Sequence, residues 1–528
     1  MKFPVGIQTF ETIRKGGYAY ADKTALIHKL VDGGQAYILS RPRRFGKSLL
    51  LSTLEAYFCG RRELFEGLAM EGLETEWAEH VVFHIDLGGM NYAESGTLEA
   101  KLLNYVTEWE EQFGVTPLVN NLSVRFSNVI RKAQKTHNRG AVVLVDEYDK
   151  PLLDVLGLKM TVRVDGMEMT LEERNRDILR GFYSVLKEQD RNLRFVLLTG
   201  VTKFAQVSVF SGLNNLNDIS MDPRYEALCG ITPSELEEVF GAEMDDMAAE
   251  RRWTPGSLRD KIRRRYDGYH FSRRLTDIYN PYSLVKALDS REIEDHWFKT
   301  GTPTYLIRLL NGSDAKLDEM AGHYYRVNMF EDYRADVEKP LPMIFQSGYL
   351  TIKNYDEDTE TYLLDFPNDE VRRGFLPLVA DSYLGVGDKT IPTVIGLSRT
   401  LKEGDFSGFM EKLTAFLASI PYTMRRKDSE PERERYFQYT FFLILRLLGT
   451  YTVGVEVAQS QWRVDCVVKT AADVYVLEFK LDGTADEALR QISERGYARP
   501  YEGGPLRVHK VGVSFSSETG TIGEWREE

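Results

Sequence analysis

The sequence is poor in cysteine and has no long hydrophobic run. Its three cysteines, Cys59, Cys229 and Cys466, are far apart and form no Cys-x-x-Cys pair. This spacing argues against a zinc site and fits a reducing compartment. The N-terminus has no apolar segment of the signal-peptide kind, and the most apolar stretch, residues 441–449, is short and interrupted by Arg446. We therefore expect a cytoplasmic protein that contains no membrane span.

Positive charge is outnumbered by negative charge. The chain has 67 Lys and Arg against 80 Asp and Glu, which gives a formal net charge of −13 at pH 7. A protein that coats nucleic acid carries the opposite balance, so any contact with DNA or RNA has to be local. Arginine-rich clusters do occur, and each is more typical of a solvated helix face or loop than of a groove contact. They lie at residues 41–44, 61–62, 251–252, 263–265 and 425–427.

The sequence has the length and apolar content of a folded multidomain protein. At 528 residues it is too long for one hydrophobic core, which predicts two to four domains. Hydrophobic residues make up 43% and aromatic residues 12% of the chain, and no low-complexity tail is present. We therefore expect order nearly throughout. The regions that we predict are residues 1–231, 232–400 and 401–528.

The first region is organised around residues 36–58, an apolar run followed by a basic loop and a segment with helical spacing of apolar residues. Strand, loop and helix in this order are typical of a phosphate-binding P-loop. In such a loop, backbone N–H groups at the helix N-terminus face the nucleotide phosphates, Lys47 reaches the terminal phosphates and the Ser48 hydroxyl binds Mg²⁺. The nucleotide-binding loop that we predict is Arg44-Phe45-Gly46-Lys47-Ser48.

One position departs from the P-loop consensus. The first glycine of the pattern Gly-x-x-x-x-Gly-Lys-Ser/Thr falls at Arg41. Taken alone, the loop leaves open a surface strand–helix turn that merely contains Gly-Lys-Ser.

A second motif favours the nucleotide site. Residues 141–151 read AVVLVDEYDKP, an apolar run of the buried parallel-strand type that ends in two adjacent carboxylates. This is the pattern of a Walker B strand. Asp146 is expected to hold the Mg²⁺ ion and Glu147 to polarise the attacking water, because phosphoryl transfer needs charge neutralisation and a placed nucleophile. The alternative is a core strand that runs out into an acidic loop.

Strand-like and helical stretches alternate around these motifs. Further strands are expected at residues 81–87, 195–200 and 216–221, with helical patterns between them. This alternation predicts an α/β fold with a mostly parallel sheet, helices on both faces and a ligand beyond the carboxyl ends of the strands. We assign it to the additional-strand class of P-loop NTPases. Thr199 is then a candidate sensor of the terminal phosphate, or else an ordinary turn or cap residue.

From Thr232 the sequence becomes helical and charged, which predicts a lid or middle region. Its first helix opens with a Ser/Thr-x-x-Glu capping pattern. Arg263, Arg264 and Arg265 are candidates for a phosphate-sensing arginine, although a plain helix face is the alternative. Residues 342–364 indicate a small helix and a β-hairpin in which we recognise no chemistry.

The last hundred residues contain a second candidate site. In the strand at residues 473–480, alternation puts Glu478 and Lys480 on the same face as Val474 and Val476. A carboxylate and an ammonium group at the end of an apolar strand are costly unless they are paired or used. On the preceding strand, Asp465 again places an acid inside an apolar run.

An Asp followed by Glu-x-Lys on the neighbouring strand is the constellation of the PD-(D/E)xK nuclease core. Asp465 and Glu478 are then expected to bind Mg²⁺, and Lys480 to position or activate the water that attacks a phosphodiester. The alternative is a salt bridge on an edge strand. Glu434 on the preceding helix and Gln491 on the following helix lie where this superfamily often carries an acid and a glutamine near the metal.

Several stretches together resemble bacterial AAA-ATPase-like proteins that end in a PD-(D/E)xK nuclease-superfamily domain. They are RPRRFGKSLLLSTL, LVDEYDKP, LLTGVTKF, YDGYHFS, YNPYSL, YVLEFKLDGTADEALRQI and KVGVSFSSETGTIGEW, and they span nearly the whole chain. Family proteins carry the same basic loop, so the resemblance makes Arg41 a family variant. It also implies a C-terminal α/β domain of the restriction-endonuclease type. Trp462 departs from the family pattern before the metal-binding acid and could narrow the approach to the scissile phosphate.

The resemblance implies a protein that binds and hydrolyses ATP with Mg²⁺. Its nucleotide state would control a metal-dependent nuclease that acts on DNA or RNA in the C-terminal domain. The alternative from another class is a regulatory or scaffold switch whose nuclease fold binds nucleic acid or a protein partner without cutting. The type of nucleic acid, the oligomeric state and the trigger stay open. The catalytic residues of the first interpretation are Glu147, Asp465, Glu478, Lys480 and Gln491.

Overall fold

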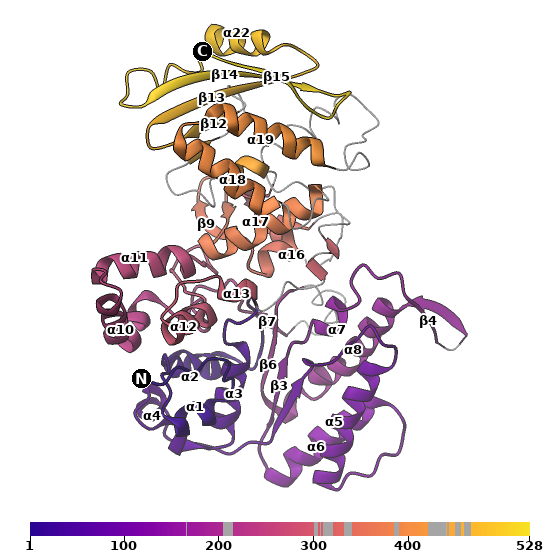
Figure 1. Cartoon of the computed structure of the whole chain (residues 1–528). Coiled ribbons are helices and arrows are strands. Elements are labelled where there is room, and N and C mark those ends of the chain that lie inside the picture. The colour runs from indigo at the N-terminus through magenta and orange to yellow at the C-terminus, as the bar shows by residue number, and fades with distance from the viewer. Residues whose placement is uncertain are drawn as a thin grey trace. The chain divides into compact units, whose positions relative to one another are not determined.

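The computed structural model forms two compact units, Met1–Val371 and Arg372–Glu528 (Figure 1). This division, after Val371, lies between the two domain boundaries that we expected after residues 231 and 400. Those two boundaries stay predictions. The residues that the structure describes are 1–164, 166–203, 215–299, 305–306, 308–309, 320–331, 340–384, 390–420, 440, 443–448, 456–458 and 466–528.

The first unit is built on a five-stranded sheet with the order β2-β3-β6-β1-β7, in which all neighbouring strands are parallel. Strand β6 lies between β1, which leads into the P-loop, and β3, which carries the Walker B carboxylates. This inserted strand confirms the predicted additional-strand class. The strands are β1 (Ala36–Ser40), β2 (Val82–Asp86), β3 (Ala141–Asp146), β6 (Leu193–Gly200) and β7 (Asn217–Asp218).

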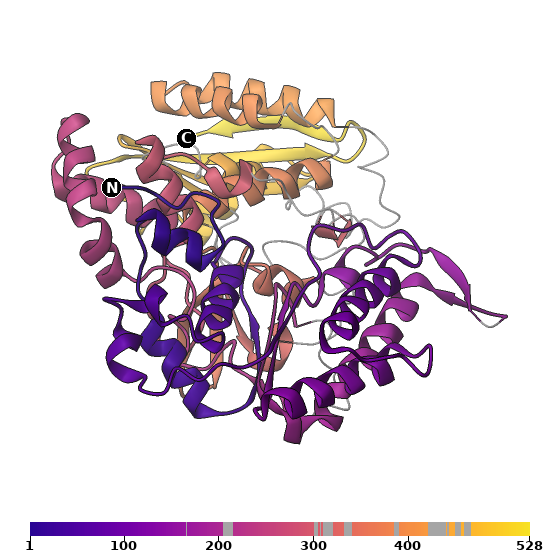
Figure 2. The same ribbon diagram turned by 90° about the horizontal axis from the view of Figure 1, so that it is seen from below.

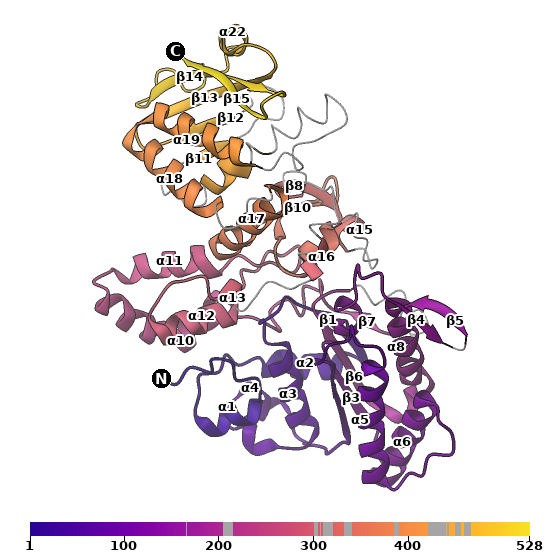
Figure 3. The same cartoon turned by 45° about the vertical axis from the view of Figure 1, so that its right-hand side comes forward.

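Helices cover both faces of this sheet, which is why its strands are almost continuously apolar. On one face lies α3 (Lys47–Phe58), with α1 (Phe10–Gly16), α2 (Thr24–Gly33) and α4 (Ala69–Leu73) beside it (Figure 3). On the other face lie α5 (Thr97–Phe113), α6 (Leu122–His137) and α8 (Leu171–Glu188), as Figure 2 also shows. Between β3 and β6 the chain also forms α7 (Lys150–Leu153) and a projecting hairpin of β4 (Thr161–Val164) and β5 (Met167–Thr170).

A helical region follows β7, as predicted. Its three longest described helices each begin with a proline behind a capping side chain, from Thr232, Thr254 and Asn280. Their apolar faces form one core that includes Phe240 and Val285. The helices are α10 (Pro233–Glu250), α11 (Pro255–Tyr266), α12 (Pro281–Ser290) and the short α13 (His296–Lys299).

The first unit ends with a small antiparallel sheet of order β8-β10-β9. The predicted hairpin is formed by β9 (Thr351–Asp356) and β10 (Thr361–Asp365), and β8 (His323–Arg326) pairs with β10. Two short helices, α15 (Val327–Phe330) and α16 (Leu341–Gln346), pack against each other beside this sheet.

The second unit holds a mixed five-stranded sheet of order β11-β12-β13-β14-β15. Strands β13 and β14 are parallel and the other pairs are antiparallel. The strands are β11 (Glu456–Ala458), β12 (Cys466–Lys469), β13 (Asp473–Leu481), β14 (Arg507–Ser516) and β15 (Thr521–Glu527). Helix α17 (Asp369–Leu384) crosses the boundary between the units, and the described helices of the second unit include α18 (Thr390–Glu403), α19 (Phe406–Ser419) and α22 (Ala485–Arg495).

Strand β13 presents different residues to the two faces of this sheet. Phe406 of α19 stacks on Tyr475 at 4.4 Å between ring centroids, on one face. Val474 and Val476 point to the other face, where they share a core with Leu489 of α22. The helix-covered mixed sheet agrees with the predicted α/β domain, and the predicted alternation along β13 is confirmed. None of the described helices has both the length and the apolarity to cross a lipid bilayer.

Candidate nucleotide site and candidate nuclease site

The P-loop places the N-terminus of α3 at the edge of a cavity. Gly46 precedes the helix with φ of 91°, a left-handed conformation that favours glycine, and no side chain caps the first N–H groups of α3. A Cβ atom on Gly46 would meet no atom within 4 Å, so the space in front of the helix is open. Uncapped N–H groups facing open space are suited to bind a phosphate.

Lys47 is folded back onto its own loop. Its Nζ donates hydrogen bonds of 3.0 Å to the carbonyl oxygens of Arg41 and Pro42. Burial lowers the pKa of Lys47, while the negative charge of Asp146 acts in the opposite direction. Lys47 lines the cavity, and binding a phosphate through its ammonium group would require it to exchange these carbonyls for phosphate oxygens.

The Walker B carboxylate lies in the same cavity. Asp146 is 5% exposed, and its Oδ1 accepts hydrogen bonds from the Thr199 hydroxyl at 2.7 Å and from the Glu147 N–H at 3.0 Å. Ser48 also lines the cavity, so the available ligands are the oxygen atoms that Mg²⁺ prefers. Thr199 is fully buried and does not line the cavity. Its hydroxyl reaches the cavity only through its hydrogen bond to Asp146, and its role as a sensor of the terminal phosphate stays a prediction.

Glu147 lines the cavity in a strained backbone conformation, with φ of 52°. Its carboxylate lies against Gly88, where a Cβ atom would be 3.0 Å from Oε2. Burial raises the pKa of Glu147, and the neighbouring Asp146 charge adds to the effect. A carboxyl group held this way at the cavity edge is suited to orient a water molecule.

Arg41, at the position of the missing glycine, points away from the cavity into the protein. Its Nη1 donates to the carbonyl oxygens of Ser40 at 2.9 Å and Ser220 at 2.7 Å. The guanidinium lies 4.1 Å from the ring centroid of Phe271, and burial lowers its pKa to about 10. Arg41 therefore anchors the start of the loop and leaves the phosphate side open.

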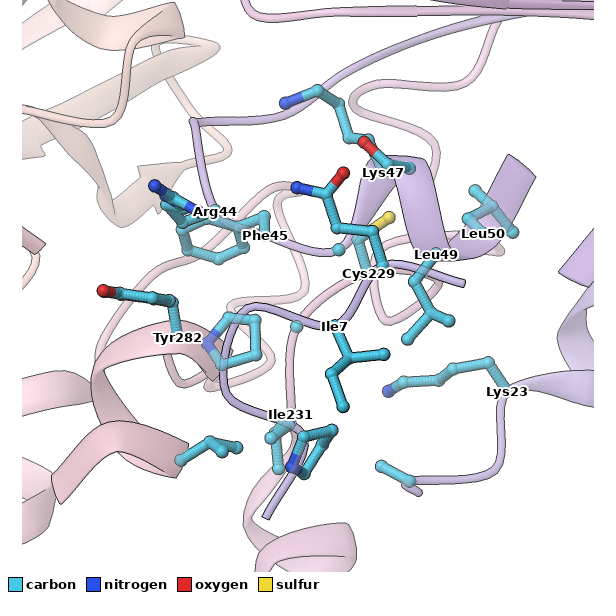
Figure 4. Close-up of a pocket in the computed structure, with 18 of the residues that line it drawn as sticks. Ile7, Lys23, Arg44, Phe45, Lys47, Leu49, Leu50, Cys229, Ile231 and Tyr282 are labelled. Carbon is cyan, nitrogen blue, oxygen red and sulfur yellow. The ribbon is translucent and has the colours of Figure 1, made fainter. Parts of the chain in front are cut away.

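The cavity has a volume of about 370 Å³, within the range of small-molecule sites. Its polar end is formed by Lys47, Ser48, Asp146 and Glu147. The other end is largely apolar and is formed by residues far apart in the sequence (Figure 4). These include residues 4–8 of the N-terminal segment, Ile13, Ile27, Leu50, Ile231, and Phe240, Tyr282 and Val285 of the helical region.

The helical region meets the P-loop through aromatic side chains. The Arg44 guanidinium lies 4.8 Å from the ring centroid of Tyr282, which also lines the cavity. Phe45 is fully buried and packs edge-on against Tyr269 at 4.7 Å between ring centroids. Arg44 and Phe45 therefore connect the loop to the helical region. Neither Tyr282 nor the N-terminal segment was predicted as part of the site. Tyr282 lies in YNPYSL, one of the stretches that carry the family resemblance, but that stretch contains no nucleotide-binding pattern.

The arginines of α11 do not line the cavity. Arg263 and Arg264 have largely exposed side chains near Asp260 and Asp369, and Arg265 pairs with Asp295 at 2.7 Å. We therefore do not assign a phosphate-sensing role to any of the three. The residues that the helical region brings to the cavity lie on α10 and α12 or just before them.

In the second unit, the predicted residues of β13 and α22 converge. Lys480 Nζ lies 2.6 Å from Gln491 Oε1 and 3.4 Å from Glu478 Oε1, and Gln491 Nε2 donates to the same Glu478 oxygen. Glu478 is 3% exposed, so its carboxylate lies buried beneath Lys480 and Gln491. This much of the predicted constellation is present in the structure.

Asp465, Trp462 and Glu434 lie outside the described residues. The first described residue of β12, Cys466, pairs with Leu477, the neighbour of Glu478. Among the described residues, no group of three or more His, Cys, Asp or Glu side chains forms a metal site. The residues described thus supply one of the two carboxylates that we expect to bind metal.

Two family models match the chain. Residues 4–210 match the model of a predicted AAA-ATPase, and residues 432–525 match the PD-(D/E)XK nuclease superfamily. The chain is also 37% identical to an "Uncharacterized protein in vnfD 5′region" of Azotobacter chroococcum mcd 1, over 99% of this chain and 98% of that protein. The chain belongs to the AAA-ATPase-like family. No solved structure matches this AAA-ATPase-like protein. The predicted resemblance is thereby confirmed for both ends of the chain.

Proposed function

We propose that this AAA-ATPase-like protein binds and hydrolyses ATP with Mg²⁺, and that its nucleotide state controls a metal-dependent nuclease in the second unit. The observation that carries the proposal is a single cavity with phosphate-binding groups at one end and apolar walls at the other. A nucleoside triphosphate combines the same two chemistries, and the cavity volume is of the size that such ligands need.

Each residue at the polar end has a distinct task in the proposed reaction. The N–H groups of α3 and Lys47 bind the phosphates, and Ser48 and Asp146 hold the cation, which neutralises phosphate charge when bound. Thr199 keeps the Asp146 carboxylate in place through its hydrogen bond. Glu147 orients the attacking water, and its strained backbone holds the carboxylate at the cavity edge.

The nuclease part of the proposal rests on Glu478, Lys480 and Gln491. Their mutual hydrogen bonds hold a carboxylate, an ammonium and an amide together at the end of β13. Lys480 would position the attacking water, and Gln491 fixes the orientation of Lys480. Asp465, which directly precedes Cys466 in the chain, is the second carboxylate that we assign to the Mg²⁺ site, and DNA or RNA is the proposed substrate.

The ATP-binding proposal is tested with two substitutions at the polar end. Lys47→Ala should reduce ATP affinity at least tenfold, because it removes the charge that meets the terminal phosphates. Glu147→Gln should bind ATP like the wild type and lose most hydrolysis, because the amide cannot polarise water. Isothermal titration calorimetry and phosphate release measure the two effects. Absence of binding to wild-type protein at millimolar ATP would refute the proposal.

Cleavage of labelled DNA and RNA with Mg²⁺ or Mn²⁺ tests the nuclease proposal. We expect wild-type protein to cut one of them, and Glu478→Gln to lose at least a hundredfold in rate while binding ATP normally. Lys510→Met, on the neighbouring strand β14, is a control that removes a charge outside the site. Binding of nucleic acid without cutting, under all these conditions, would favour the scaffold alternative.

A further inference from the structure

Lys23 occupies an unusual place at the apolar end of the cavity. It is 9% exposed and lines the cavity, and its side chain extends toward Ile7 and Ile231 (Figure 4). An ammonium group at such a place loses much of its hydration, which is costly unless the charge is paired or used.

The two neighbours of Lys23 hold its backbone in place. The Asp22 carboxylate accepts hydrogen bonds of 2.8 Å from the N–H groups of Thr24 and Ala69. The Thr24 hydroxyl accepts from the N–H of Met70 at 3.0 Å. Asp22 and Thr24 thus fix the start of α2 against α4, and they leave the Lys23 side chain to face the cavity.

Lys23 is paired with Glu235 of α10. Its Nζ lies 2.6 Å from Oε1 and 2.5 Å from Oε2 of that carboxylate. Glu235 is itself held by the capping box of α10, in which its carboxylate accepts from the Thr232 N–H at 2.8 Å. The ion pair therefore joins the wall of the cavity to the first turn of a helix in the helical region.

The ion pair leaves part of the lysine unused. An ammonium group has three N–H donors, and Glu235 accounts for two. Among the described residues, no other hydrogen-bond acceptor contacts Lys23 Nζ. A pair of apolar side chains would fill the same space at a lower cost in folding free energy, because the desolvation of a buried ion pair usually offsets its Coulomb attraction. A role in ligand binding explains why charged residues occupy this position.

We propose that Lys23 reads the base of the bound nucleotide, by donating its third N–H to a ring nitrogen of a purine. The inference rests on the proposed ATP binding and deepens it. Through Glu235, the same contact ties the base to α10, so that a purine with the right acceptor holds the helical region against the cavity. A base without that acceptor leaves a buried N–H unpaired, which is where discrimination arises.

The test compares ATP with its 1-deaza, 3-deaza and 7-deaza analogues, each of which lacks one ring nitrogen. Wild-type protein should bind one of the three about tenfold more weakly than ATP. Lys23→Met keeps the length of the side chain and should bind ATP and that analogue with equal affinity. Inorganic tripolyphosphate, which has no base, should bind both proteins alike.

Controls separate this inference from stability effects and from the proposed function. Lys23→Met leaves the Glu235 carboxylate buried without its partner. The double variant Lys23→Met/Glu235→Met removes both charges, and its affinities for ATP and the deaza analogues are measured in the same way. Lys29→Met, at an exposed lysine of α2, the helix that directly follows Lys23, should behave like wild type. Failure of wild-type protein to bind ATP or tripolyphosphate would refute the nucleotide site. Equal binding of ATP and all three analogues by wild-type protein, or an unchanged preference in both Lys23 variants, would overturn the role of Lys23 alone.

Discussion

Glu370 shows how a single buried carboxyl group can support the P-loop from a distance. It is 1% exposed, and its Oε1 accepts a 2.7 Å hydrogen bond from the N–H of Trp297. The Trp297 indole in turn donates to the carbonyl oxygen of Arg43 in the P-loop at 3.1 Å. Burial raises the pKa of Glu370 to about 7, with Asp295 adding to the effect.

The raised pKa of Glu370 predicts a pH dependence of stability. The folded-state pKa of about 7 lies above the ordinary 4.5, so folding favours the protonated form. The stabilisation is complete below pH 4.5 and is lost as the pH rises through 7. Glu370→Gln keeps a hydrogen-bond acceptor for the Trp297 N–H and cannot ionise. At pH 8 its free energy of unfolding should therefore be about 3 kcal/mol larger than that of wild type, which means that the variant is more stable.

Urea unfolding between pH 5 and pH 8 measures this difference. The gap between Glu370→Gln and wild type should shrink steadily toward pH 5. Asp369→Asn changes the neighbouring, partly exposed carboxyl group and serves as the matched control. A gap that stays constant across the pH range would contradict the assignment of the effect to Glu370.

The functional residues of the P-loop and the Walker B strand were predictable from the sequence, because phosphate and Mg²⁺ binding require these residue types at fixed positions in each motif. Lys47, Ser48, Asp146 and Glu147 all line one cavity, as their motifs predict. Lys23 was not predictable, because its partner Glu235 is 212 residues away and no local pattern joins them. The inward orientation of Arg41 was not predictable either, because its acceptor Ser220 is 179 residues away in the sequence.

At the scale of elements, periodicity predicted the parallel strands well and predicted turns poorly. Strands β2, β3 and β6 lie close to their expected ranges, because buried parallel strands are continuous apolar runs. The strand expected at residues 216–221 is limited to Asn217–Asp218. Beyond Asp218 the chain turns. The Ser220 carbonyl oxygen then accepts a hydrogen bond from the Arg41 guanidinium instead of pairing with a neighbouring strand.

The P-loop itself is an element whose shape depends on distant parts of the first unit. Gly348, with φ of 85°, lies directly against Pro42, where a Cβ atom would come within 2.5 Å of Pro42 Cγ. Phe45 packs against Tyr269 and Phe271. These contacts explain how a loop without the first consensus glycine is held in a phosphate-binding shape, and they join it to the helical region.

At the scale of the whole molecule, the proposed control of the nuclease needs a route out of the nucleotide site. Within the first unit such a route exists. Asp149, beside the Walker B motif, accepts hydrogen bonds from the N–H groups of Val201 and Thr202 and from the Thr202 hydroxyl. The next residue, Lys203, is 3% exposed and pairs with Asp218 at 2.9 Å and Glu331 at 2.5 Å.

Lys203 also connects to α16 through its backbone, whose N–H donates to Gln346 Oε1 at 2.7 Å. The loop after β6 is therefore fastened on one side to the Walker B motif and on the other to α15 and α16. A ligand shifts an equilibrium only by its differential binding to two states. A change at Asp146 or Glu147 on ATP binding would reach α15 and α16 through this loop.

The last prediction is that Lys203 carries the effect of ATP on cleavage. The cleavage rate should differ among ATP, ADP and no nucleotide, and Lys47→Ala should erase the difference by removing binding. Lys203→Met should bind ATP with wild-type affinity and still lose the difference, because its contacts to Glu331 and Asp218 are gone. Lys187→Met, at an exposed lysine of α8, is the matched control and should keep the full ATP effect. An ATP effect of wild-type size in Lys203→Met would exclude this route. If wild-type protein binds ATP but cleaves at the same rate with ATP, with ADP and without nucleotide, the two units are tethered without being coupled.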